Sequence, residues 1–146
     1  MAGIGDTNRL ASLYDHVTAA GLVYPTGAAG ATVLTGVADW TWSVAYNAVV
    51  PIATINSRFH IHTVTIETCS VGTDAVYELA LYSGVGHDLV SSIRFSVAGG
   101  FFGNQVYLVP CALIGPGLQV DARCASSDGL AHPATLTISI GYCIED

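Results

Sequence analysis

The chain has 146 residues, of which 51% are hydrophobic and only 10% are charged, and its formal net charge is −7 at pH 7. All four basic residues are arginines, so the chain lacks the cationic patch with which proteins neutralise nucleic-acid phosphates. No apolar run reaches the roughly 18 residues of a membrane-spanning helix. We therefore expect one soluble domain that binds neither nucleic acid nor membrane.

The low charge also bears on self-association. An average soluble domain has roughly 25% charged residues, far more than this chain. Little surface charge is left to keep copies apart, which favours permanent assembly. A mildly acidic monomer is the alternative that composition leaves open.

Residues 1–31 differ from the rest and are expected to form an N-terminal arm and linker. Asp6-Thr7-Asn8 can cap a short helix, and a Gly/Ala-rich stretch follows from Thr26 to Ala31. The apolar residues of the predicted helix share one face: Leu10, Leu13, Tyr14 and Val17. This face could dock on its own domain or contact a neighbouring subunit, and both remain open.

Residues 32–146 are expected to form one all-β domain, because apolar and polar residues alternate with period two. Ile93, Phe95 and Val97, for example, share a parity opposite to Ser92 and Arg94. The pattern predicts about eight strands: Thr32–Val37, Trp40–Val50, Phe59–Thr68, Ala75–Ser83, Leu89–Val97, Gln105–Val109, Leu118–Cys124 and Ala134–Cys143. Gly-rich turns separate them, and this arrangement favours an antiparallel jelly-roll-like sandwich.

One constellation could bind a metal. His60 and His62 lie on one face of a predicted strand, and Glu67 follows five residues later, which resembles the first metal motif of the cupins. The glycines that flank the cupin motif are absent, with Thr54 and Asp74 in their places. Glu67 also has the wrong parity unless a bulge intervenes. Two ordinary sheet histidines are the favoured interpretation, and we expect no metal or other cofactor.

Two tryptophans are candidates for interaction. Trp40 and Trp42 have the same parity in a predicted strand, which suits core packing or a subunit interface, or else a sugar-stacking platform. The sequence contains no nucleophile elbow, phosphate loop or CxxC pair, so we expect no enzyme. Cys143 has outward parity and is the cysteine that could cross-link chains.

Several segments resemble one family in their order along the chain. They are Val50–Ile52, Phe59–His62, Val76–Gly84, Ser92–Phe95, Ala122–Ser127 and Thr135–Ile140. Together they are similar to small jelly-roll virion proteins of tailed bacteriophages. The chain departs from that pattern at His60, where an acidic residue is common.

The resemblance implies a capsid decoration, or cement, protein. Such a protein would form a homotrimer on the major capsid protein lattice, be located on the virion surface after assembly in the host cytoplasm, and have no catalytic residues. A phage fibre or tail component, or a host-glycan-binding module, is the alternative. A cupin-like metalloprotein is a more distant one.

Overall fold

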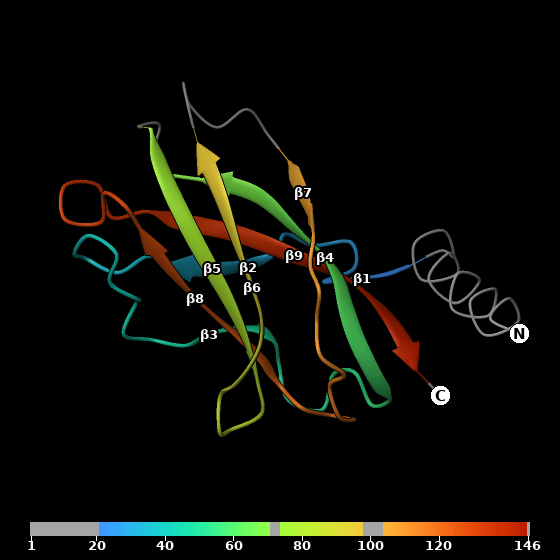
Figure 1. Cartoon of the computed structure of the whole chain (residues 1–146). Coiled ribbons are helices and arrows are strands. Elements are labelled where there is room, and N and C mark those ends of the chain that lie inside the picture. Colours follow the sequence, from blue (N-terminus) through green and yellow to red (C-terminus); the bar gives the residue numbers. More distant parts are fainter. Residues whose placement is uncertain (1–20, 71–73, 98–103, 146) are drawn as a thin grey trace, which may run out of the picture.

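The computed structural model describes residues 21–70, 74–97 and 104–145. These ranges contain strands and loops but no helix, and hence no helix able to cross a membrane (Figure 1). The strands are β1 (Leu22–Tyr24), β2 (Ala31–Leu34), β3 (Asn47–Val50), β4 (Arg58–Cys69), β5 (Ala75–Ser83), β6 (Asp88–Val97), β7 (Gln105–Leu108), β8 (Val120–Ser126) and β9 (Thr135–Glu145). The expected all-β class is confirmed.

The strands form two antiparallel sheets. The first sheet has the order β1-β9-β4-β7, with β2 also paired to β9, and the second has the order β3-β8-β5-β6. The pairs are nested along the chain, because β2 pairs with β9, β3 with β8, β4 with β7 and β5 with β6. A long ribbon folded in this way is a jelly roll, so the predicted sandwich is confirmed.

The core lies between the two sheets and follows the predicted alternation. Phe95 and Val97 of β6 are buried, as are Leu136, Ile138 and Ile140 of β9. Burial of their apolar surface is the main favourable term that holds the sheets together. The period-two pattern therefore identified the inward face of these strands correctly.

The predicted strand over Trp40–Val50 is wrong in its first part. Only Asn47–Val50 is a strand, whereas Trp40 has a positive φ of 53°. The preceding loop hydrogen-bonds instead to the edge of β8, where the amides of Gly36 and Ser43 both donate to the carbonyl oxygen of Cys124. These long-range bonds override the local β propensity of the aromatic residues.

The predicted boundary at residue 31 also differs from the structure. β1 begins at Leu22 and pairs with β9, so the sandwich includes part of the expected linker. The predicted helix and its interaction residues Leu10, Leu13, Tyr14 and Val17 lie outside the described residues.

Candidate interaction surfaces

The histidine and glutamate residues of the cupin-like motif do not converge. The register shift in β4 between Ile61 and Thr63 lies between the histidines and Glu67, and it brings Glu67 to the same outer face as the histidines. Five residues of strand still separate His62 from Glu67 by about 15 Å. His60 Nδ1 lies 3.1 Å from Glu145 Oε1, and Glu67 Oε2 accepts a 2.7 Å hydrogen bond from the Gly30 amide. Within the described ranges, no three His, Cys, Asp or Glu side chains are placed to hold a metal ion.

The two tryptophans are not equivalent. Trp40 is 46% exposed and carries the Arg94 guanidinium 4.9 Å from its ring centroid, whereas Trp42 is half-buried. Arg94 Nη2 also donates to Glu78 Oε2 at 3.2 Å across neighbouring strands. The loop that holds Trp40 is anchored by a 2.7 Å bond from the Trp40 amide to the Ser126 carbonyl oxygen. Trp40 is therefore a rigidly presented aromatic side chain over the outer face of the second sheet.

A second aromatic cluster, which the sequence did not predict, lies near the β5–β6 hairpin. The rings of Tyr46 and His87 stack with their centroids 3.7 Å apart, and Tyr82 contacts Tyr46 edge-on. The Arg123 guanidinium lies 4.8 Å from the Tyr46 ring centroid. Burial raises the pKa of the Tyr82 hydroxyl, and the nearby Arg123 partly offsets that rise.

Asp121 is the buried carboxylate of this cluster. Its Oδ2 accepts a 2.8 Å hydrogen bond from Gln119 Nε2. His87 Nδ1 lies 3.2 Å from the same oxygen, but the two atoms do not form a hydrogen bond. A buried carboxylate is costly unless polar groups surround it. His87 therefore fastens the β5–β6 hairpin to β8 and to the loop before β3.

Replacement of His87 by alanine is expected to destabilise the protein by about 1–3 kcal/mol. The variant loses the ring stacked on Tyr46 and one polar neighbour of buried Asp121. Urea unfolding at pH 6 measures the difference. The matched control is Asp88→Ala, because Asp88 is adjacent and exposed. If both variants unfold at the same urea concentration, His87 does not have this anchoring role.

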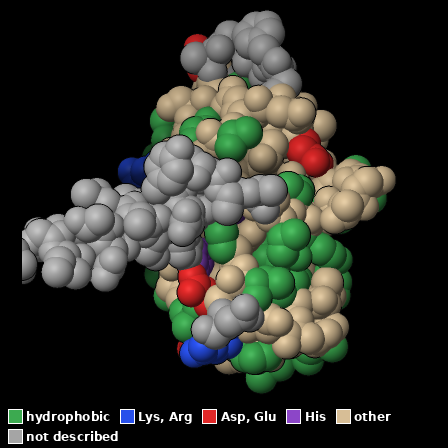
Figure 2. All heavy atoms as spheres, turned by 90° about the vertical axis from the view of Figure 1, so that its right-hand side faces the viewer, with side chains coloured by type: hydrophobic (Ala, Val, Ile, Leu, Met, Phe, Trp, Pro, Cys, Tyr) green, Lys and Arg blue, Asp and Glu red, His purple; other side chains and the backbone are tan. Residues whose placement is uncertain are grey.

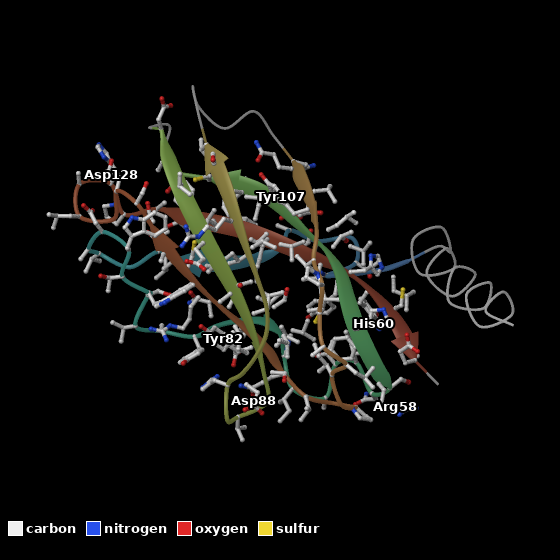
Figure 3. The ribbon with its side chains drawn as sticks, in the orientation of Figure 1. Arg58, His60, Tyr82, Asp88, Tyr107 and Asp128 are labelled. Carbon is white, nitrogen blue, oxygen red and sulfur yellow. The ribbon has the colours of Figure 1, made fainter. Side chains whose placement is uncertain are left out.

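The loop after β3, the β5–β6 hairpin and the loop between β7 and β8 meet at one end of the sandwich, the lower end in Figure 1. These segments carry exposed aliphatic side chains. We call this set the apolar end, and its members are each between 39% and 81% exposed: Ile52, Val85, Leu89, Leu113 and Leu118. Figure 2 shows hydrophobic side chains gathered in the lower half of the adjoining face. Charged side chains at this end, Arg58 and Asp88, are seen in Figure 3.

Backbone hydrogen bonds fix the loops of the apolar end. The Ala53 amide donates to Gly117, and the Ala112 amide donates to Val90. The Gly84 amide donates to Gln119. Each bond lies next to a member of the apolar end, so these side chains are held on a defined surface. The sequence signal was present, because Ile52, Val85 and Leu113 are aliphatic residues in segments rich in Pro and Gly, where polar residues are usual.

A shallow hollow of about 200 Å³ opens beside β1 and β3. Its walls include Tyr24, Pro25, Val49 and Pro51, and its lining contains no charged side chain. Tyr24 brings the one titratable side chain of this lining, and no second acid, base or anion-binding side chain of the lining accompanies it, so the hollow supports no assignment of a catalytic site.

All four cysteines are free thiols. Burial raises the pKa of Cys111, Cys124 and Cys143, and Glu145 adds to the rise at Cys143. A raised pKa lowers the thiolate fraction at neutral pH and with it the reactivity of these side chains. Cross-linking through Cys143 stays a prediction.

No protein-family model matches this chain, and no curated protein matches it. Its function must therefore be argued from its own residues and their arrangement. The two candidate binding surfaces are the apolar end and the aromatic side chain of Trp40.

Proposed function

We propose that this protein is a structural virion protein, a capsid decoration protein that binds the major capsid protein lattice as a homotrimer and stabilises the head. The observation that carries the proposal is the apolar end, an ordered set of exposed aliphatic side chains on a charge-poor jelly roll. The family resemblance in the sequence supports the same role. The proposal assigns no catalytic residue and no cofactor.

The energetics suit a lattice contact. Full burial of one aliphatic side chain contributes about 1.5–3 kcal/mol, so a few members of the apolar end supply useful affinity after the cost of association. Surfaces that stay buried in permanent assemblies are apolar and poor in charge. The apolar end would face the lattice, and symmetry would repeat the contact in every trimer.

The purified protein is expected to be a trimer in solution. Light scattering at roughly physiological salt measures this, and the expected mass is three times that of the 15.1 kDa chain. The trimer should then sediment with particles assembled from the major capsid protein encoded in the same genome. A monomer that stays in the supernatant at all concentrations tested would count against the proposal.

Trp40 favours a second candidate function, a host-glycan-binding module of a phage fibre or tail. A tryptophan in the left-handed region costs about 1 kcal/mol or more, yet its indole stays 46% exposed. Such a ring can stack on a sugar, and Glu78 and Arg94 could bind hydroxyl groups beside it.

Under this second candidate, a glycan array should reveal a ligand whose binding falls at least about 10-fold in Trp40→Ala, as expected for a loss near 1.4 kcal/mol. The half-buried Trp42 offers the matched control, Trp42→Phe, which should keep binding. An array without any ligand removes this candidate.

A further inference from the structure

The edge strand β7 lacks the features that protect the edges formed by β6, β3 and β2. Edge strands usually carry charges, prolines or bulges that prevent pairing with another chain. β6 has Asp88 and Arg94, β3 has a register shift and is followed by Pro51, and the Leu34 amide of β2 is capped by Asn47 Oδ1. β7, Gln105–Leu108, has none of these features.

The backbone of β7 is oriented for pairing. The Val109 amide donates to the His62 carbonyl oxygen, so the alternate residues Gln105 and Tyr107 also direct their backbone groups toward β4. Val106 and Leu108 therefore direct theirs toward the open edge, where β7 has no partner among the described strands. Their side chains are on the outer face and are 63% and 75% exposed. One strand laid along this edge would satisfy the backbone groups and cover both side chains.

The opposite edge of the same sheet is formed at β1, which is uncharged like β7 but is followed by Pro25. β1, Leu22–Tyr24, pairs only with β9 among the described strands, and Leu22 and Val23 are both exposed. Neither β1 nor β7 contains a charged residue, so no like-charge repulsion opposes their contact.

Strand direction determines which assembly these edges can build. β1, β9, β4 and β7 alternate in direction across the sheet. Because this path has four strands, its two edge strands, β1 and β7, run in opposite directions. A neighbouring copy rotated about an axis parallel to the strands keeps its strand directions. Its β1 would then lie antiparallel to β7 and continue the alternation. This contact is heterologous, and heterologous contacts close into rings such as trimers.

We propose that β7 of one copy pairs antiparallel with β1 of the next copy, so that three first sheets join around a three-fold axis. This inference rests on the proposed homotrimer and identifies its subunit contact. The apolar end is a separate surface and stays available for the lattice.

Leu108→Lys tests the contact, because a lysine on an open edge opposes strand pairing. The matched control is Leu130→Lys, since Leu130 is 74% exposed and Leu108 is 75% exposed, but Leu130 is in a loop. For Leu108→Lys, light scattering over a range of protein concentrations should show that the dissociation constant of the subunit contact rises at least about 10-fold, which corresponds to a loss near 1.4 kcal/mol. The control should remain trimeric, and both variants should keep the far-UV circular dichroism spectrum of the wild type, which shows that the sandwich is folded.

Cysteine pairing identifies the partner strand. Val23→Cys combined with Leu108→Cys should give disulfide-linked trimers on oxidation with diamide, which takes up the two thiol hydrogens as each S–S bond forms. Each single variant should match the oxidised wild type. Covalent dimers from Leu108→Cys alone would overturn the inference in favour of two-fold β7–β7 pairing. If the wild type is a trimer that Leu108→Lys does not weaken, the β7–β1 contact is wrong but the proposed trimer stands. If the wild type is a monomer, both the contact and the proposed trimer are wrong.

Discussion

Replacement of Phe59 by alanine is expected to lower the free energy of unfolding by about 3–5 kcal/mol, the usual cost of deleting a buried aromatic ring. Phe59 is fully buried in β4 and contacts the Tyr142 ring edge-on, with ring centroids 5.8 Å apart. Its backbone exchanges two hydrogen bonds with Ile114, of 3.1 and 2.7 Å. The cavity left by alanine would thus lie beneath the loop that carries Leu113 and Leu118.

Urea unfolding, compared at equal protomer concentration because assembly adds to apparent stability, measures the loss. Val44→Ala is the control, since Val44 is 94% exposed and its truncation should stay within about 0.5 kcal/mol. A loss below about 1 kcal/mol for Phe59→Ala would mean that the ring does not fill the core. Phe59→Leu keeps most of the apolar volume and should recover part of the stability.

The double variant Leu89→Asp/Leu113→Asp is expected to weaken binding to the capsid lattice by at least about 100-fold without lowering stability. Because Leu89 is 62% and Leu113 53% exposed in the free protein, each substitution removes about 1–2 kcal/mol of apolar burial in the complex. Each also places a carboxylate that must be desolvated. Leu89 and Leu113 adjoin the hydrogen bond between Ala112 and Val90 and are both more than half exposed. In the free protein the new carboxylates remain in water, so folding should be unaffected.

Co-sedimentation with particles that lack the decoration protein measures this loss. Val44→Asp provides the control, because Val44 is exposed in the loop before β3 and is not a member of the apolar end. Light scattering on the same samples shows whether the double variant is still trimeric, as the assignment of subunit contact to β1 and β7 requires. Undiminished binding by a well-folded double variant would exclude the apolar end as the lattice surface.

The two expected effects separate stability from function. Phe59 acts through the core, and its loss should change both the melting temperature and the order of the overlying loop. Leu89 and Leu113 act only when a partner covers them, so their substitution should change binding alone. A protein whose apolar end had no partner would show the first effect without the second.

The sequence by itself determined most of the strands and their inward faces, although it missed β1 and extended β3 too far toward its start. Phe95 and Val97, or Leu136 and Ile138, could be assigned to the core because alternation in a strand is a local property that needs no knowledge of the partner strand. The same residues indicated the antiparallel sandwich, since several half-buried strands in series must cover one another. Low charge indicated assembly without showing where the contacts lie.

Only the tertiary structure decided the surfaces. The Trp40 loop departs from its predicted strand because its amides bond to β8, more than eighty residues away, and such bonds leave no local signal. The register shift in β4 between Ile61 and Thr63 brought Glu67 to the face of His62 but not within reach of it. The open edge of β7 and the clustering of the apolar end likewise depend on which strands and loops pair across the fold, and that pairing is a property of the whole chain.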